Sequence, residues 1–350
     1  MVRFRILLFL GVSLVLAGCK PLKFEQPHSL SPGEKSPYTG RDWMVLKQLY
    51  TESDRFSFYD TWEKERSLYY AGPLVLPEGP QSLFPFGMLQ LQDSLYLDIT
   101  EVPVVAYREY YHAMGLRAEV KPRFPFDYDS LYFSNPAMQF HPMVSVTKEQ
   151  ADGYCRWRGA VVNQQIALRR LRGEPEWEQD GEPLQVFMRL PTEEEFLVAA
   201  SGGLDTTQYR FGYATLLQDV EFTSQDIEYL QERFWFRRST AQIEAELERF
   251  VAGGNKMPVF NVRWPYAPSS LRLPIPTYVY SFRPNPLGFY HLVGNVSEWI
   301  GDRSYVMGGN FRQSINDFVL QEGEEMATEN STDVGFRCAC ILATQPPDNY

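Results

Sequence analysis

Four cysteines are the residues of this sequence best suited to chemistry: Cys19, Cys155, Cys338 and Cys340. A thiolate is a nucleophile and a soft metal ligand, and two thiols can also close a disulfide. Cys338 and Cys340 are two residues apart, so on a strand both side chains would face the same way and could bind a metal together. If Cys19 is acylated, three thiols remain, which allows one disulfide and one free thiol in an oxidising compartment.

Cys19 ends a segment typical of an export signal. Arg3 and Arg5 form a basic start, an apolar run follows at 6–15, and the segment closes with the sequence LAGC at 16–19. The run is too short to span a bilayer, and small residues directly before a cysteine are typical of a lipoprotein cleavage site. We therefore expect a lipid on Cys19. The alternative is an ordinary secretory signal cleaved near Ala17.

Composition favours one compact, irregular domain behind this anchor. Residues 20–38 are rich in Pro, Ser, Gly and charge, which predicts a tether. Aromatic residues make up 15% of the chain, beside 24 Gly and 25 Pro, so much of the core must be aromatic side chains under loops. The formal net charge of −11 excludes nucleic acid and anionic lipid headgroups as favoured partners.

Capping patterns predict the helices that must position any site. We expect one helix over 100–115, with Thr100 as its N-cap. Thr147 and Gln150 match a capping box that starts a helix running to about residue 172, and Thr192 and Glu195 match another that ends before the glycines at 202–203.

A charged helical stretch at 223–251 has a different character. It carries two apolar stripes and should break near Ser239, where Ser239 and Gln242 again match a capping box. The stripes could pack back on the parent domain. Alternatively, the stretch is a partner-docking insertion with Phe234, Trp235 and Phe236 as its anchors. Residues 253–290 have no periodicity and predict long ordered loops.

Seven motifs occur in an order that resembles one family. They are LDITEV at 97–102 with Tyr107, HPMVSV at 141–146 with Ala151, Tyr154, Cys155 and Trp157, RLPTEEEF at 189–196 with the alanines and glycines at 199–203, YRFG at 209–212, LGFY at 287–290 with GNVSEW at 294–299 and Asp302, MGGNF at 307–311, and GFR at 335–337. Together they resemble the formylglycine-generating enzyme, or sulfatase-modifying factor, family. The resemblance implies a single α+β domain with little regular secondary structure, related to the C-type lectin fold.

The signal pattern, the composition and the resemblance together divide the chain. We expect a signal peptide (1–18), a lipid-anchored tether (19–39), an N-terminal extension (40–84), the family domain (85–342, with the helical insertion 223–251) and a C-terminal tail (343–350). The segment between the helix at Thr147 and the motif at Arg189, which contains WR at 157–158 and VN at 162–163, is similar to that of gliding-motility and type IX secretion lipoproteins of Bacteroidetes.

The family's oxidative chemistry depends on two cysteines that follow the glycine-glycine motif and hold copper. Gln313 and Phe318 stand at those two positions here. Neither side chain can supply a thiolate, the ligand that Cu(I) prefers. We therefore expect no formylglycine-generating activity. The four histidines, His28, His112, His141 and His291, lack the spacing of the three-histidine iron site found in a sister branch.

Other family features carry over residue by residue. The resemblance implies a disulfide between Cys155 and Cys338 with Cys340 free, in competition with the metal interpretation of Cys338 and Cys340. A calcium motif would fall on His291, Gly294, Val296 and Glu298, although an imidazole is a poor ligand for a hard cation. The alternative is that Glu298 hydrogen-bonds its own loop. Arg189, Glu195, Asn295, Trp299 and Arg337 are predicted to tie loops together by charge-assisted hydrogen bonds.

From these features we expect a non-catalytic scaffold lipoprotein of the cell envelope. It would lie at the periplasmic face of the outer membrane, contact other envelope proteins as part of a secretion or gliding machinery, and need no cofactor, with calcium as the exception. Two alternatives remain open: an enzyme of altered chemistry on the same fold, and a lipoprotein that binds a glycan or another ligand.

Overall fold

The computed structural model describes residues 36, 38–39, 87–124, 132–133, 138–173, 178–179, 182–219, 222, 224–233, 237–272, 275–317, 320, 322–325 and 331–347. The signal peptide, Cys19 and nearly all of the tether and extension lie outside these ranges. Within them, no helix is both long enough and apolar enough to cross a membrane.

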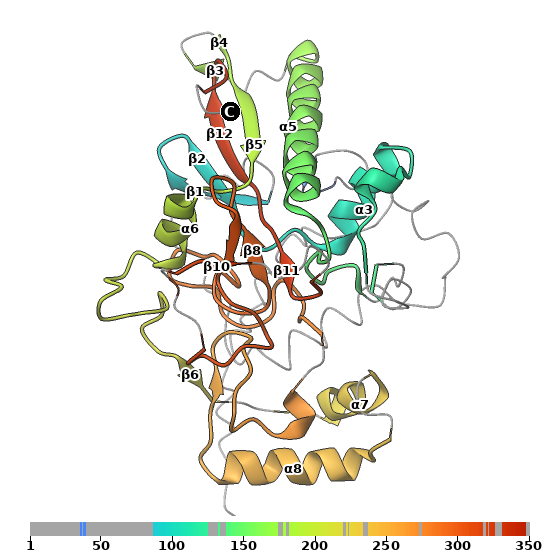
Figure 1. Cartoon of the computed structure of the whole chain (residues 1–350), viewed down its shortest axis with the longest axis vertical. Coiled ribbons are helices and arrows are strands. Elements are labelled where there is room, and N and C mark those ends of the chain that lie inside the picture. The colour runs from blue at the N-terminus through green and yellow to red at the C-terminus, as the bar shows by residue number, and fades with distance from the viewer. Residues whose placement is uncertain are drawn as a thin grey trace, which may run out of the picture.

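The larger sheet joins the start of the domain to its end. Its order is β1 (Met88–Gln92), β2 (Leu95–Asp98), β12 (Ala339–Ala343) and β5 (Gln185–Arg189). All neighbours are antiparallel, and Ala339 lies opposite both Leu97 and Arg189. The C-terminal strand is therefore central, and the helix α5 (Lys148–Leu171) lies alongside the sheet (Figure 1).

Helix α5 starts at the predicted capping box of Thr147 and Gln150. Further along, two of its residues attach it to strand β5. Gly159 brings the helix against Met188, since a Cβ at that glycine would lie 3.3 Å from the Met188 backbone nitrogen. One turn further, the Asn163 amide donates to the Val186 carbonyl at 2.9 Å and accepts from its N–H at 2.8 Å. Asn163 thus serves as a hydrogen-bonding partner for the backbone of β5.

The second sheet is built from very short strands in the order β10 (Glu324–Glu325), β9 (Tyr305–Met307), β8 (Ser297–Trp299) and β11 (Val334–Gly335). Strand β11 pairs with β8 in parallel, with Gly335 opposite Glu298. A Cβ at Gly335 would lie 2.8 Å from the Met143 carbonyl, so only glycine permits this approach. The pairing of β11 with β8 thus places the GFR motif beside the GNVSEW motif, and the close approach to Met143 brings it against the HPMVSV motif.

The remaining elements are small and separated by long loops. They are α3 (Val104–Ala113), η2 (Ala118–Val120), β3 (Glu178–Gln179), β4 (Glu182–Pro183), α6 (Glu193–Ala200), β6 (Leu217–Gln218), α7 (Ser224–Arg233), α8 (Thr240–Ala252), β7 (Met257–Pro258) and η4 (Ser269–Leu271). The capping boxes of α6 and α8 are the predicted ones. The predicted N-cap Thr100 is wrong: α3 begins only after Pro103, and the Thr100 hydroxyl donates to the adjacent Glu101 carbonyl instead of capping a helix.

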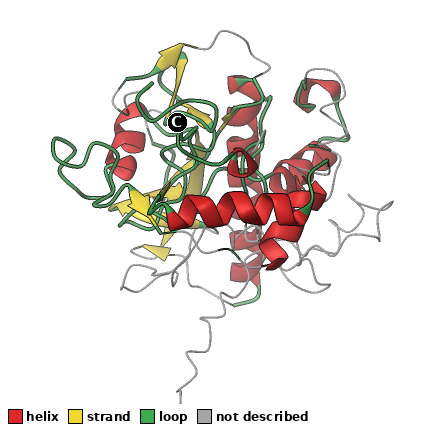
Figure 2. Ribbon diagram, turned by 90° about the horizontal axis from the view of Figure 1, so that it is seen from below, coloured by secondary structure: helices red, strands yellow, loops and turns green. Residues whose placement is uncertain are grey.

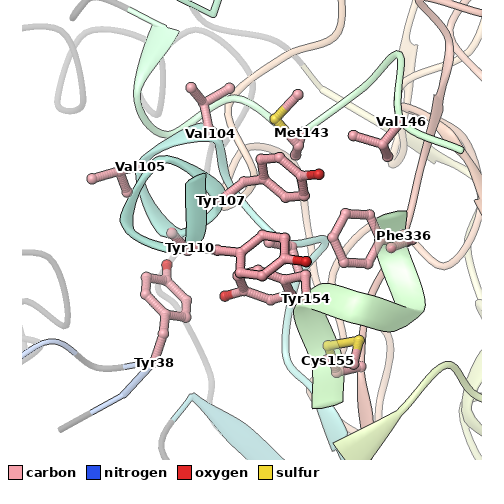
Figure 3. Packing of buried hydrophobic residues seen from close by; sticks show 14 of the residues in the cluster. Tyr38, Val104, Val105, Tyr107, Tyr110, Met143, Val146, Tyr154, Cys155 and Phe336 are labelled. Atoms are coloured by element: carbon pink, nitrogen blue, oxygen red, sulfur yellow. A yellow bond between two sulfur atoms is a disulfide. The ribbon is translucent and has the colours of Figure 1, made fainter. Parts of the chain in front are cut away.

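Aromatic side chains fill the core between α3, α5 and the last strands. Tyr107, Tyr110 and Tyr154 meet edge-on or stacked, with ring centroids 5.5 to 5.8 Å apart, and Phe336 packs edge-on against Tyr154 (Figure 3). Beside them the Cys155–Cys338 disulfide joins α5 to the approach of β12, over a separation of 183 residues. The disulfide predicted from the resemblance is therefore confirmed, and Cys340 is free and buried.

The predicted insertion forms two helices, α7 and α8, that lie at one end of the molecule (Figures 1 and 2). Their inward side chains make a cluster with residues of the parent domain: Ile227, Leu230, Ile243, Leu247, Phe250, Met257, Ala267, Leu271 and Phe282. The interpretation that the stripes pack back on the parent domain is confirmed. The proposed anchors Phe234, Trp235 and Phe236 lie outside the described residues.

Candidate functional site

A layer of buried charge crosses the centre of the domain where the sequence motifs meet. Arg337 has no exposed surface, and its Nε and Nη2 each donate to a Glu298 oxygen at 2.7 Å. The same guanidinium donates to the carbonyls of Asp98 at 3.0 Å and Tyr290 at 2.8 Å. Arg337 therefore links strand β2, the loop before β8 and β8 itself.

A second buried pair extends the layer toward α5. Arg158 donates from Nη1 to both Asp98 oxygens, at 2.7 and 2.9 Å, and from Nε to the Tyr38 carbonyl at 2.9 Å. The backbone N–H of Cys338 donates to Asp98 Oδ2 at 2.8 Å. Asp98 thus accepts hydrogen bonds from two sides. The Asp98–Arg158 pair connects Cys338, one of the two disulfide cysteines, with Tyr38 in the described part of the tether region.

Glu101 is the third carboxyl of the layer and has fewer partners. Its Oε1 accepts from the Asn295 amide at 2.9 Å, whereas its Oε2 has no hydrogen-bond partner among the described residues. Asn295 in turn accepts from the N–H and hydroxyl of Thr277 and from the Asn261 amide. Asn295 adopts φ 61°, a conformation that asparagine tolerates better than most residues.

The charges of this layer balance only if one carboxyl keeps its proton. Asp98, Glu101 and Glu298 face two guanidinium groups, those of Arg158 and Arg337. Burial, reinforced by the charge of Glu298, raises the pKa of Glu101 well above its usual range. Burial also raises the pKa of Glu298, but Arg337 opposes that rise through both its charge and its hydrogen bonds. Glu101 is the one carboxyl of the three that is not hydrogen-bonded to a guanidinium, so its protonated form is the most favoured of the three.

The residues of the predicted calcium motif lie in this layer but do not form a cation cage. Both oxygens of Glu298 accept hydrogen bonds from Arg337, so neither is left to bind a metal ion. His291 is buried, and burial together with the charge of Arg337 lowers the pKa of His291 to about 3. Gly294 allows the chain to pass Asn261, since a Cβ there would lie 2.3 Å from that carbonyl. Val296 is fully buried. The donor set present does not suit Ca²⁺.

The other predicted structural residues tie loops at the edge of the layer. Arg189 donates from two nitrogens to the two Glu195 oxygens, each at 2.7 Å, and Glu195 also accepts from the Thr192 N–H. The Trp299 indole donates to the Val146 carbonyl at 3.0 Å. Asp98, Glu101 and Arg158 were not predicted as members of a site, although the two acidic residues lie within the first motif and Arg158 lies on the helix predicted to start at Thr147.

The loop that carries the family's copper cysteines is used differently here. Gln313 Oε1 accepts from the Asn310 N–H at 3.0 Å, and the Gln313 carbonyl accepts from the Arg263 N–H at 2.9 Å. The Gln313 amide thus closes a tight turn at the position of the first thiolate. Phe318, at the second position, lies outside the described residues. Among those residues no group of three His, Cys, Asp or Glu side chains could hold a metal ion.

Cys340, the other thiol of interest, lies away from this loop. It is fully buried on β12 opposite Tyr96 and Met188, and burial raises the pKa of its thiol. With Cys338 in the disulfide, the interpretation of Cys338 and Cys340 as a paired metal site is wrong.

A cavity of about 360 Å³ opens beside the loop that contains Gln313. Phe311 and Arg312 line it from the loop, and Arg263 and Trp264 line it from the segment that follows β7. The rear wall includes Phe282, which belongs to the cluster formed with α7 and α8. Sequence patterns gave no indication of this cavity because its residues come from loops without periodicity.

Comparisons with known proteins agree with this architecture. The family model described as the sulfatase-modifying factor enzyme 1-like domain (FGE-sulfatase) matches residues 70–341. The chain therefore belongs to this family, as a single domain of mixed α+β structure with little regular secondary structure. A comparison with curated proteins gave no match.

Several solved structures resemble the chain at low sequence identity. Treponema denticola variable protein 1 is 17% identical, with 71% of this chain and 84% of that one covered and a TM-score of 0.38. CarF is 18% identical, with 79% and 95% covered and a TM-score of 0.35. PvdO from Pseudomonas aeruginosa is 14% identical, with 71% and 80% covered and a TM-score of 0.38.

Proposed function

We propose that this protein is a non-catalytic member of its family, anchored to the cell envelope by a lipid on Cys19 and acting as a scaffold for other envelope proteins. The observation that carries the proposal is the role of Gln313. An amide replaces a thiolate at the first copper position, and that amide is used to close a turn through the Asn310 N–H. A carboxamide cannot replace a thiolate as a ligand of Cu(I).

The buried layer supports the same conclusion. Its carboxyls and guanidinium groups are buried. Asp98 and Glu298 bond to arginines and Glu101 bonds to Asn295, so these groups hold loops in place and do not face a substrate. The export signal at 1–19 and the resemblance to gliding and secretion lipoproteins favour an envelope location. The α7–α8 insertion, which adds a separate helical surface to the family domain, favours contact with partner proteins.

Copper binding and oxygen consumption test the absence of the family's chemistry. The purified protein is titrated with Cu(I), and oxygen uptake is followed in the presence of a cysteine-containing peptide. We expect neither stoichiometric copper binding nor turnover. The matched control is the double substitution Gln313→Cys with Phe318→Cys, which should restore tight copper binding if the two positions are matched correctly. Turnover by the unmodified protein would overturn the non-catalytic assignment.

Membrane fractionation tests the anchor. The Cys19→Ala variant should fail to receive a lipid and should leave the membrane fraction, while a Cys340→Ala variant should fractionate as the unmodified protein does. Retention of Cys19→Ala on membranes washed with high salt would contradict the lipoprotein assignment. The partner role is tested by cross-linking and purification from membranes, in which deletion of 223–251 should remove the bound envelope proteins.

A further inference from the structure

We propose that the cavity beside Phe311 binds a small organic anion, namely a carboxylate or phosphate group carried on a flat apolar body. The inference concerns the folded domain and does not depend on the lipid anchor or on the scaffold role.

The charge of the cavity is opposite to that of the protein. Arg263, Arg272 and Arg312 all line it, and none of the described lining residues is Asp or Glu. The whole chain carries a formal net charge of −11, so three arginines around one concavity are a marked local reversal. A concave site of one sign with low-dielectric walls focuses the potential and attracts the opposite charge.

The three arginines are held in different ways, and the carboxylates that pair with two of them do not line the cavity. Arg263 and Arg312 form ion pairs with Asp317 at 3.1 Å and Asp333 at 3.3 Å, and both arginine side chains are at least half exposed. Such exposed pairs are weak. Arg272 instead donates to the carbonyls of Pro265 and Ala267, and no described carboxylate lies within ion-pair distance of it. Its guanidinium is fixed in place, which lowers the entropic cost of binding an anion.

The apolar lining selects the rest of the ligand. Trp264, Phe282 and Phe311 provide aromatic surface, and the Arg312 guanidinium lies 4.9 Å from the centre of the Phe311 ring. Tyr266, which is 72% exposed, packs edge-on against Trp264 and extends this aromatic surface outward. A volume of about 360 Å³ suits a small molecule or a single terminal residue of a peptide.

The insertion gives this cavity a preformed wall. Met257, Ala267, Leu271 and Phe282 line the cavity and also belong to the cluster that α7 and α8 complete. Phe282 is held at φ 63°, a conformation that a bulky residue adopts only when its surroundings fix it. A wall that is already packed needs no ordering when a ligand binds.

Calorimetric titration of the full-length protein in detergent tests the proposal. The probes are phenylacetate and phenyl phosphate, with the neutral phenylacetamide and inorganic phosphate as matched controls. A peptide that ends in phenylalanine is compared with its C-terminal amide, so that a free small molecule and a peptide terminus can be distinguished. We expect at least tenfold weaker binding of phenylacetamide than of phenylacetate. The relative affinities of phenylacetate and phenyl phosphate then identify the preferred anion.

Variants assign the binding to the cavity. Arg263→Gln and Arg312→Gln should each weaken binding about tenfold, and Trp264→Leu should weaken the binding of the phenyl compounds more than the binding of inorganic phosphate. The control Arg303→Gln removes an exposed arginine that pairs with Glu193 outside the cavity and should change nothing. The proposal is overturned if phenylacetamide binds as well as phenylacetate, if inorganic phosphate alone binds as tightly as phenyl phosphate, if neither anion binds at millimolar concentration, or if Arg303→Gln is as damaging as Arg312→Gln.

Discussion

The buried charged layer and the α7–α8 insertion stabilise the same domain by opposite means. The layer joins residues far apart in sequence, such as Arg337 with Asp98 and Asn295 with Glu101, through fully buried polar groups. The insertion joins neighbours in sequence through apolar side chains, including Leu230, Ile243 and Leu247.

The comparison shows what each kind of contact can do. A buried charge tolerates only a partner in the correct place, so the layer fixes how the loops of the domain meet. An apolar cluster gains stability from burial but is less selective about geometry, and it can be added to a completed fold without changing that fold. We therefore expect damage to the layer to affect the whole domain and damage to the insertion to remain local.

The largest effect is expected from Arg337→Met. It leaves Glu298 buried without its cation, a change that costs about 3–5 kcal/mol. Urea unfolding followed by near-UV circular dichroism measures it. The double variant Arg337→Met with Glu298→Leu should recover part of that loss, because it removes the uncompensated charge. Arg263→Gln, which breaks the exposed pair with Asp317, should cost about 1 kcal/mol or less. Equal losses in Arg337→Met and Arg263→Gln would contradict the assigned role of the layer.

A smaller and local effect is expected from Leu247→Ala. Its side chain is 2% exposed within the insertion cluster, and truncating a buried leucine costs about 2–5 kcal/mol. Hydrogen exchange should become faster in α7 and α8 while β5 and β12 keep their protection. The control is Glu248→Ala on the exposed face of α8. If β5 and β12 lose protection to the same extent as α8, the insertion is not an independent unit.

Local sequence signals predicted the parts of the fold that depend on neighbouring residues. The capping boxes at Thr147, Thr192 and Ser239 were confirmed, because a side chain and a backbone N–H three residues away decide each of them. Thr100 has the right residue type for an N-cap, but the chain around it is held by long-range contacts, among them the bond from Arg337 to Asp98. Tertiary contacts overrode the local signal there.

Long-range features were accessible only through the family resemblance. The Cys155–Cys338 disulfide spans 183 residues, and nothing in the spacing of three thiols selects that pair. Asp98 and Arg158, 60 residues apart, carry no pattern that marks them as partners. The cavity was missed for the same reason: Arg263, Arg272 and Arg312 come from separate loops that have no hydrophobic period to place them.

The effect that is smallest near pH 4, and most specific to the layer, is expected from Glu101→Gln. Because the pKa of Glu101 is raised in the folded protein, the folded state keeps a proton that the unfolded state loses above its ordinary value of 4.5. The unfolded state then binds fewer protons, so the free energy of unfolding falls as the pH rises, by at most about 1.4 kcal/mol per pH unit for one proton.

Glutamine has the shape of a protonated glutamate and can still accept from the Asn295 amide. The variant should match the unmodified protein within about 1 kcal/mol near pH 4, since both then carry a neutral group at this position. Its advantage should grow as the pH is raised, because only the unmodified protein loses stability through Glu101. Urea unfolding at a series of pH values from 4 to 8 measures the difference between the two curves. Glu298→Gln is the control and should destabilise at every pH, because it removes an acceptor that Arg337 needs. Parallel curves for Glu101→Gln and the unmodified protein would mean that Glu101 titrates alike in both states, and the layer would then hold an uncompensated negative charge.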